Sequence, residues 1–255
     1  MYNLFTVLNS AYMPFGKIWL NSLHRNTDVE MIKKVYILDT GLSAEDLEYL
    51  KRFPKVNIVK SDIDIKHTSD ALPKNSLWLQ HVLRKTKFFR TVIKNDPTPL
   101  IMVDSDCMFV SDFLRHIPQG KDVLVCNRSY HQHDNWIASF FVVNNVENGL
   151  VFMKLWIDRM KKLMVEKPER GWFESHSLNL CLQELRQYNP YSLKVGDVFT
   201  ANVACEEPDL FSEQDTSILH FKGTSKKTNF QERITRFDEV VDVKQEIWKY
   251  VNDQG

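Results

Sequence analysis

Two aspartates separated by one residue follow an apolar run near the middle of the chain. The run is Leu100–Val103, and the acids are Asp104 and Asp106. A short apolar run is typical of a strand that is buried on both faces, so the two carboxylates should lie where that strand ends. Carboxylates held close together repel each other, and burying one is costly unless a positive group joins it. A divalent cation is the simplest partner for this pair.

The same two acids also have an interpretation without a metal. Aspartate caps turns and helix starts, and an isolated Asp-x-Asp often arises by chance because short motifs are common. The pair by itself therefore does not separate a metal site from a capped turn, and other segments have to decide.

A second segment, Ser217–Lys226, carries an imidazole and an ammonium group on either side of a glycine. His220 ends an apolar run, Gly223 permits a tight turn, and Lys226 follows that turn. Across such a turn the imidazole can approach a metal while the ammonium approaches phosphate oxygens. A histidine at a strand end is more often structural, so this segment becomes informative only together with the Asp-x-Asp.

The segments around these residues alternate between strand-like and helix-like patterns. We expect strands at residues 4–8, 34–39, 56–60, 100–103, 123–126 and 137–143, and helices at residues 15–24, 44–53, 76–93, 147–165 and 174–188. Ser43 and Ser175 are the expected N-caps of the second and the last of these helices. Such alternation predicts βαβ units with parallel pairing and right-handed crossovers, and a chain of 255 residues can form one large α/β domain.

Polar side chains after the first strand are placed to meet a ligand, because ligands of open α/β sheets bind outside the carboxyl ends of the strands. Asn9 and Tyr12 lie in that loop and would meet a base or a ribose. Tyr12 is also compatible with a packed loop aromatic that touches no ligand.

The helix expected at residues 76–93 carries a basic stripe formed by Arg84, Lys87 and Arg90. A basic stripe is usually a solvated face. Here one short turn separates the helix from the Asp-x-Asp strand, so these cations are also candidates to face the same ligand.

Composition excludes several classes of function. Lys plus Arg equals Asp plus Glu at 33 each, so no overall field draws the protein to nucleic acid or to an acidic membrane. Met1–Phe5 lacks the features of a signal peptide, and the longest apolar run, Ile137–Val143, is too short for a membrane span. We therefore expect a cytoplasmic protein with reduced core thiols at its cysteines, Cys107, Cys126, Cys181 and Cys205.

Several segments, in order, resemble the GT-A glycosyltransferases of family 8, the group of glycogenin and the bacterial lipooligosaccharide galactosyltransferases. The resemblance rests on Leu38–Ser43, on Val103–Asp106 as the metal motif and on His220–Lys226 as a His-x-x-Gly-x-x-Lys segment. It implies a single-domain GT-A, Rossmann-like α/β fold with a mostly parallel mixed sheet flanked by helices. Residues up to about 110 would bind the nucleotide, and residues from about 111 to 255 would form the acceptor side with a C-terminal helix.

The resemblance also implies an activity, the metal-dependent transfer of a sugar from a nucleotide-diphosphate sugar, here UDP-linked, to an acceptor hydroxyl in glycan or polysaccharide biosynthesis. Asp104, Asp106 and His220 would hold Mn²⁺ or Mg²⁺. The uridine would contact Asn9 and Tyr12, and the diphosphate would contact Lys226. The donor sugar and phosphate would contact Lys87, with Arg84 and Arg90 as the alternatives. The full set of donor-binding residues would be Asn9, Tyr12, Arg84, Lys87, Ser105, Gly223 and Lys226.

Two segments depart from the family pattern. Ile137-Ala138-Ser139 stands where the family typically has Asn-x-Gly. Glu174-Ser175 stands where it often has Asp-Gln, which keeps a carboxylate but loses an amide. We expect Glu174 to border the donor sugar and to orient it or stabilise its developing positive charge. The alternative is a helix-start acid that interacts only with the helix dipole.

Two rival functions remain at this point. A sugar-1-phosphate nucleotidyltransferase shares the architecture, but it normally needs a glycine-rich basic loop after the first strand, and Asn9–Tyr12 is not one. A non-catalytic nucleotide-sugar-binding protein is the second rival. The acceptor stays open among lipid-linked glycans, polysaccharide, protein and small molecules, because acceptor pockets are built from variable loops.

Overall fold

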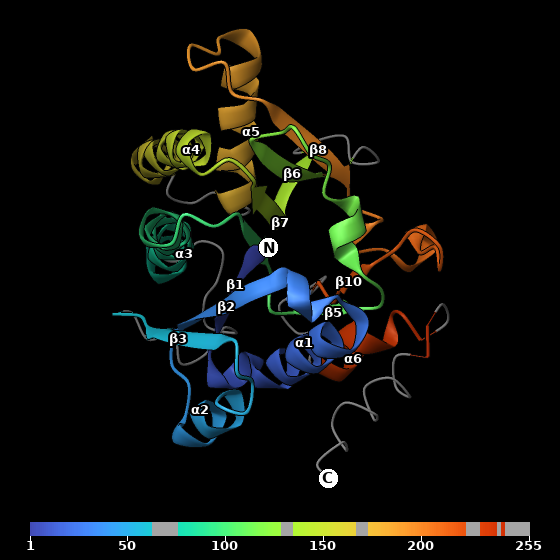
Figure 1. Cartoon of the computed structure of the whole chain (residues 1–255). Helices are drawn as coiled ribbons and strands as arrows, with labels where there is room; N and C mark the ends of the chain where they lie inside the picture. The colour runs from blue at the N-terminus through green and yellow to red at the C-terminus, as the bar shows by residue number, and fades with distance from the viewer. Residues whose placement is uncertain (63–75, 129–134, 167–172, 223–229, 239–240, 243–255) are drawn as a thin grey trace.

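A seven-stranded sheet forms the centre of the computed structural model, which describes residues 1–62, 76–128, 135–166, 173–222, 230–238 and 241–242 (Figure 1). The strand order is β3-β2-β1-β4-β7-β6-β8. The strands are β1 (Tyr2–Leu8), β2 (Ile32–Asp39), β3 (Val56–Lys60), β4 (Leu100–Val103), β6 (Val123–Asn127), β7 (Trp136–Val143) and β8 (Val195–Phe199).

The sheet is mixed but mostly parallel. Strands β3, β2, β1 and β4 pair in parallel, and β6 pairs with β8 in parallel, whereas β7 runs antiparallel to both of its neighbours. The carboxyl ends of β1, β2 and β4 therefore meet at one edge of the sheet. The expected α/β fold with a mostly parallel mixed sheet is confirmed.

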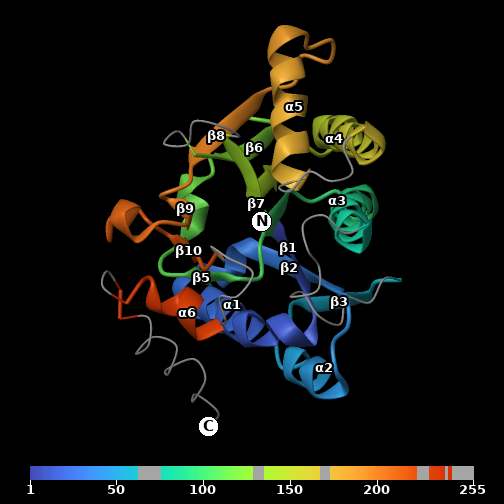
Figure 2. The same ribbon diagram turned by 180° about the vertical axis from the view of Figure 1, so that it is seen from behind.

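Helices cover both faces of this sheet (Figures 1 and 2). Apolar residues of α3, α4 and α5 form one cluster with one face, and those of α1 and α2 form another with the opposite face. The helices are α1 (Met13–Asn26), α2 (Ala44–Leu50), α3 (Ser76–Asn95), α4 (Val146–Glu166), α5 (Phe173–Gln187) and α6 (Phe230–Thr235).

Strand β4 shows why the motif after it is rigidly placed. Leu100 and Met102 face the cluster under α3, while Ile101 and Val103 face the cluster under α1, and all of them are at most 2 % exposed. The expectation of a strand buried on both faces is confirmed. Because tightly packed interiors leave side chains little freedom, the chain leaves β4 in a fixed direction.

A second, three-stranded sheet lies beside α1 and α6 and is seen from behind in Figure 2. Its strands are β5 (Cys107–Phe109), β9 (Val203–Cys205) and β10 (Ile218–His220), in the order β5-β10-β9. Strand β5 pairs antiparallel with β10, and this register places His220 opposite Cys107. The sequence predicts neither β5 nor β9, because strands of three residues carry too little periodicity to be recognised.

The two predicted N-caps have different outcomes. Ser43 caps α2 in a capping box with Asp46, as predicted. Ser175 does not cap α5, because that helix already begins at Phe173, whose ring is 2 % exposed and packs in the core. The prediction of Ser175 as the N-cap is therefore wrong, and Glu174 lies in the first turn of the helix.

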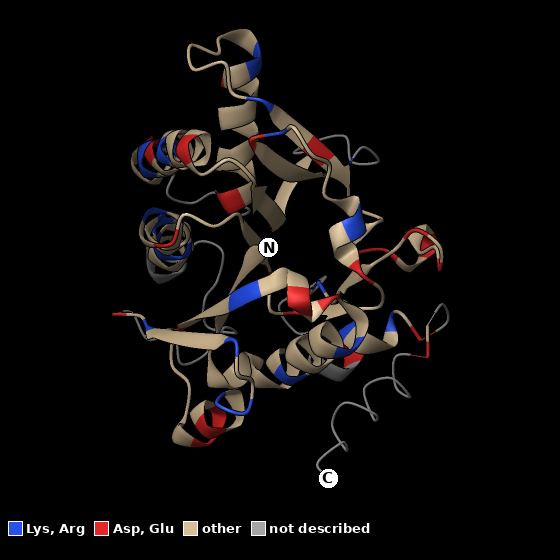
Figure 3. Ribbon diagram, viewed as in Figure 1, with Lys and Arg blue, Asp and Glu red and all other residues tan. Residues whose placement is uncertain are grey.

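Charged residues of both signs are interspersed over the described elements, as the alternating colours along α4 illustrate (Figure 3). All the cysteines are buried and free, which agrees with the expected core thiols. Among the described residues, no helix combines the length and the apolarity that crossing a bilayer requires.

Candidate functional site

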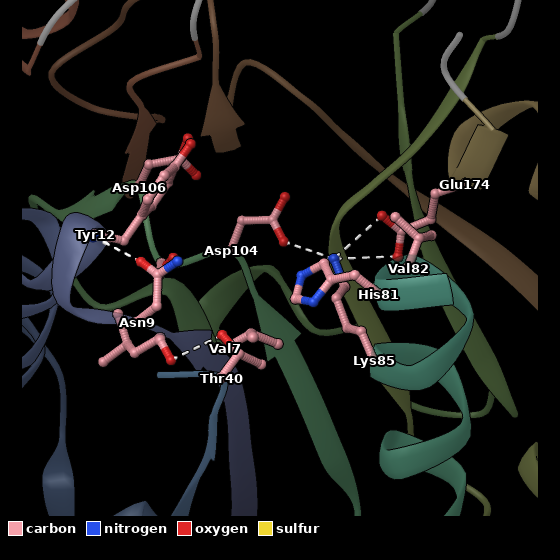
Figure 4. Close-up of a pocket in the computed structure, with 12 residues that line it drawn as sticks. Val7, Asn9, Tyr12, Thr40, His81, Val82, Lys85, Asp104, Asp106 and Glu174 are labelled. Atoms are coloured by element: carbon pink, nitrogen blue, oxygen red, sulfur yellow. Dashed lines mark hydrogen bonds and ion pairs between the residues drawn. The ribbon is translucent and has the colours of Figure 1, made fainter. Parts of the chain in front are cut away.

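The ends of three neighbouring parallel strands open into one pocket (Figure 4). Asn9 follows β1, Thr40 follows β2 and Asp104 follows β4, which is the edge at which open α/β sheets bind ligands. Helix α3 and the start of α5 close the pocket from the other side. The lining residues are Val7, Leu8, Asn9, Tyr12, Thr40, His81, Val82, Lys85, Asp104, Ser105, Asp106 and Glu174.

Lys85 is the central cation of this pocket. Its Nζ lies 2.9 Å from Asp104 Oδ1 and 3.2 Å from Glu174 Oε2, and the residue is only 7 % exposed (Figure 4). Burial alone would lower the pKa of Lys85, but the charges of Asp104 and Glu174 outweigh burial and raise it above its usual value. Lys85 therefore stays protonated and joins two acids that come from different parts of the chain.

Glu174 is a pocket carboxyl group whose pKa is raised. Burial raises its pKa, the charge of Lys85 opposes that rise and Asp104 adds to it, and the resulting pKa is about 7. Its exposed side-chain fraction is 17 %. A carboxyl group of this kind can orient a hydroxyl, hold a proton or stabilise a nearby positive charge.

Asp106 faces a second set of cations. Its Oδ1 lies 3.3 Å from His220 Nε2, because the β5–β10 pairing brings the two residues side by side and Phe221 N donates to the Asp106 carbonyl at 2.8 Å. Arg233 of α6 donates to Asp106 Oδ2 and, at 3.3 Å, to the hydroxyl of Tyr12. These contacts hold the pKa of Asp106 below its usual value, although burial opposes this.

These residues form a possible metal site, and their chemistry fits a hard divalent ion. In the described part of the chain, ligand atoms of Asp106, Cys107 and His220 lie within 4.8 Å of one another. Burial raises the pKa of the Cys107 thiol well above its usual value, so Cys107 stays a thiol and is a poor ligand. The carboxylate of Asp106 and the imidazole of His220 are ligand types that suit Mn²⁺ or Mg²⁺. Asp104 is not part of this group of atoms and contacts Lys85 instead, but it offers a second carboxylate in the same pocket.

His220 is held between two carboxylates. Its Nδ1 lies 3.2 Å from Glu206 Oε1 on the side away from Asp106. Burial alone would lower the pKa of His220, but Asp106 and then Glu206 raise it to about 9. Burial likewise would raise the pKa of Glu206, whereas its hydrogen bond to His220 and the charges of His220, Lys222 and Arg128 lower it to about 2.

A second pocket adjoins the first and shares Asp104 and Glu174 with it. Apolar and charged side chains both line it. The lining residues besides the shared pair are Arg128, Ile137, Ala138, Ser139, Phe173, Ser175, Glu206, His220 and Lys222.

Most of the residues that the sequence singles out converge here. Asn9, Tyr12, Asp104, Ser105, Asp106 and Glu174 line the first pocket, and His220 lines the second. The side chain of Asn9 also accepts from Tyr12 N at 2.9 Å, which fixes the turn between them. Gly223 and Lys226 lie outside the described residues.

The basic stripe of α3 is not brought to the pocket. Arg84 pairs with Asp62, and Lys87 is exposed. Instead α3 turns Lys85 into the pocket, one position after Arg84 and two positions before Lys87. Lys85 lies three residues after Val82 and four before Phe89, so it is on the apolar face of α3. A lysine on an apolar helix face indicates a buried cation, and the sequence analysis does not use this signal.

His81, Glu206 and Arg233 also belong to the site and were not predicted. Burial, and then the charge of Lys85, lowers the pKa of His81 to about 4, so His81 is neutral beside the pocket. Arg233 reaches Asp106 across 127 positions of sequence. No local pattern marks Arg233 or Glu206, because pairings between distant strands and helices bring both of them to the site.

Comparisons with known proteins agree with this architecture. A model of the nucleotide-diphospho-sugar transferase family matches residues 44–231, which is most of the chain. No curated protein sequence gives a significant match.

Solved structures of glycosyltransferases share the fold. The bifunctional glycosyltransferase WbbM matches with a TM-score of 0.57 and 16 % identity, over 98 % of this chain and 51 % of that one. GlyE of Streptococcus pneumoniae TIGR4 matches with a TM-score of 0.60 and 12 % identity, over 98 % of this chain and 62 % of that one, and its apo form gives 0.61 and 13 % with the same coverage. This chain thus spans between about half and three fifths of those chains.

Proposed function

Since the chain belongs to the nucleotide-diphospho-sugar transferase family, we propose that it is a GT-A glycosyltransferase that moves a sugar from a UDP-linked donor to an acceptor hydroxyl. The observation that carries this proposal is the convergence of Asn9, Lys85, Asp104 and Glu174 on one pocket at the carboxyl ends of the strands. The proposal has two finer parts. The enzyme is of the family 8 type, and the sugar that it transfers is a hexose.

The nucleotide occupies the β1 side of the first pocket. Asn9 and Tyr12 meet the uridine there, and the Arg233 contact to the Tyr12 hydroxyl at 3.3 Å keeps that ring in place. Lys226 and Gly223 meet the diphosphate. In this scheme residues up to about 110 form the donor half of one domain, and the following residues form the acceptor half.

Asp104, Asp106 and His220 would hold Mn²⁺ or Mg²⁺ beside the diphosphate. When bound, such an ion neutralises the negative charge that grows on the diphosphate as the bond between sugar and phosphate breaks. The donor set described above, two carboxylates and one imidazole, supports this assignment.

Lys85 and Glu174 act on the sugar. As the electron pair of the breaking bond moves to the phosphate oxygen, the sugar becomes cation-like, and the carboxylate of Glu174 stabilises it. Lys85 holds Glu174 and Asp104 in position through contacts of 3.2 and 2.9 Å. The acceptor hydroxyl approaches from the second pocket, since that pocket reaches the same two carboxylates. Its oxygen forms the new bond to the sugar carbon, and its proton leaves with the nucleoside diphosphate. The acceptor would be a growing glycan or polysaccharide.

A panel of nucleotide sugars tests this function. We expect release of the nucleoside diphosphate from a UDP-linked sugar in the presence of Mn²⁺ and little release in EDTA. Asp104→Asn should abolish the Mn²⁺-dependent part, and Lys94→Ala, a change at an exposed position in the last turn of α3, is the control. If no donor is turned over but pyrophosphate forms from a nucleoside triphosphate and a sugar-1-phosphate, the chain is a nucleotidyltransferase. Binding without any turnover would identify a nucleotide-sugar-binding protein.

A further inference from the structure

Glu206 is a buried carboxylate behind the proposed metal ligands. The residue is 3 % exposed, and both of its oxygens contact cationic side chains. Oε1 lies 3.2 Å from His220 Nδ1, while Oε2 lies 3.2 Å from Lys222 Nζ and 3.4 Å from Arg128 Nη1. A buried charge is costly unless it is paired, so these three partners are what allow the Glu206 carboxylate to be buried here.

The backbone before Glu206 is bent in an unusual way. Val203 pairs with Ile218 and Cys205 pairs with Leu219, so Ala204 is an extra residue in β9 with no partner of its own in β10. Ala204 has a φ of +80° and is completely buried. Residues other than glycine rarely adopt this conformation, and they keep it only where the surrounding structure demands it.

This bulge determines where the next side chains point. Side chains alternate between the two faces of a strand, and one inserted residue reverses the face for every residue that follows. Bulges often lie beside active sites, where they redirect a side chain. Here the residue that follows the bulged strand is Glu206, and the imidazole that it meets is that of His220, at the end of the neighbouring strand β10.

We infer that Glu206 is a positioning residue for His220, and that the bulge at Ala204 directs the Glu206 carboxylate toward the imidazole. By accepting the Nδ1 proton, Glu206 fixes the imidazole plane and leaves Nε2 facing Asp106. A metal bound there would take the place of the Nε2 proton that points to Asp106 in the metal-free protein. A carboxylate in that position also makes the imidazole a stronger ligand. This inference rests on the proposed function, because it assigns His220 to the metal site.

Binding of Mn²⁺ alone tests the inference without any turnover. The signal of hydrated Mn²⁺ in electron paramagnetic resonance disappears on binding, so titration of the protein gives the affinity directly. Loss of a partner behind a metal ligand typically weakens the metal about 10–100-fold, and we expect a loss in that range for Glu206→Ala. Glu206→Gln keeps an oxygen that accepts the Nδ1 proton, so it should recover most of the affinity.

A matched control removes another buried carboxylate. Asp122 precedes β6 and so lies at the end of the sheet opposite the pocket. It is 7 % exposed and accepts from Lys194 N at 2.8 Å. Asp122→Ala should destabilise the fold without changing Mn²⁺ affinity. Thermal melts in EDTA establish which variants are folded. If Glu206→Ala does not fold, Glu206→Met replaces it, because methionine fills a similar space and offers no oxygen to the Nδ1 proton, so the same loss of affinity is expected.

The outcomes are distinct. If wild-type protein bound no Mn²⁺, the metal assignment in the proposed function would fail, and the role of Glu206 would fail with it. If wild-type protein bound Mn²⁺ and folded Glu206→Ala bound it equally well, only the positioning role would be wrong. An equal loss in Asp122→Ala would also overturn it, because the effect would then follow general stability.

Discussion

Lys85 and Glu174 lie 89 positions apart in the sequence, and their charged groups meet at 3.2 Å in a buried pair. The same ammonium group contacts Asp104 at 2.9 Å. The first aspartate of the Asp-x-Asp therefore already has a cationic partner supplied by α3. The second aspartate has one as well, because Arg233 donates to Asp106. Both acids are thus held in fixed positions by side chains of the protein itself.

Lys85→Ala should reduce turnover by roughly 10²–10³-fold, since removing one preorganised charge at a reacting centre typically costs this much. The affinity for UDP should change much less, because Lys85 lies beside the proposed sugar position rather than the nucleotide. Steady-state kinetics and UDP titrations on the same preparations separate the two effects. Lys94→Ala in the exposed last turn of α3 is the control, and equal losses in both variants would contradict a specific role for Lys85.

Glu174 should make stability depend on pH between about 4.5 and 7. Burial raises its pKa to about 7 in the folded state, so in this range the folded protein binds more protons at Glu174 than the unfolded chain does. The contribution of Glu174 is most favourable below about pH 4.5 and is lost as the pH rises through 7.

Glu174→Gln removes this dependence. The melting temperature of the variant minus that of wild type should therefore increase as the pH is raised from 5 to 8. The rate of sugar transfer should also lose any inflection near pH 7 in the variant. A difference in melting temperature that stays constant over this range would contradict a raised pKa at Glu174.

Arg233→Gln should have opposite effects on metal-free stability and on metal binding. Without Arg233, Asp106 loses a charged partner, so the melting temperature in EDTA should fall. Mn²⁺ should bind more tightly than to wild type, because it no longer competes with a guanidinium for the Asp106 carboxylate. Arg236→Gln, which removes a 2.9 Å contact to Glu207 instead, is the matched control. Weaker Mn²⁺ binding in Arg233→Gln would contradict this competition.

Ala204→Gly should preserve the bulge and leave Mn²⁺ affinity unchanged. Glycine adopts positive φ freely, and the relief of about 1–2 kcal/mol is partly offset by about 0.5–1 kcal/mol of extra chain entropy in the unfolded state. Ala204→Val should instead lower stability, because a β-branched residue resists this conformation. Urea unfolding curves measure both effects. If glycine destabilised and valine did not, the backbone strain at this position would be absent.

The sequence predicts the scaffold better than the electrostatics of the site. Strand β4 and the two aspartates after it could be predicted, because an apolar run followed by paired acids has few interpretations. The parallel order of the first strands followed from the alternation of strand and helix. The same alternation predicts Asn9 and Tyr12 after the carboxyl end of the first strand, and in the structure both residues line the pocket.

The cations were harder to predict. Lys85 does leave a signal in the sequence, because it interrupts the apolar stripe of α3, but the regular spacing of Arg84, Lys87 and Arg90 is the stronger pattern in this helix. Glu206 and Arg233 give no signal within their own segments. The β9–β10 register and the packing of α6 bring them to the site, and single-sequence patterns do not report contacts across 14 or 127 positions.

Diffraction from crystals grown with UDP and Mn²⁺ tests the central claim most directly, because the anomalous signal of manganese locates the ion without assumptions about the chemistry. We predict one anomalous peak bonded to Asp106 and His220 beside Asp104, with the diphosphate on the same ion and the uridine against Asn9 and Tyr12. A nucleotide bound elsewhere, or bound in this pocket with no manganese between the aspartates and the phosphates, would contradict the account.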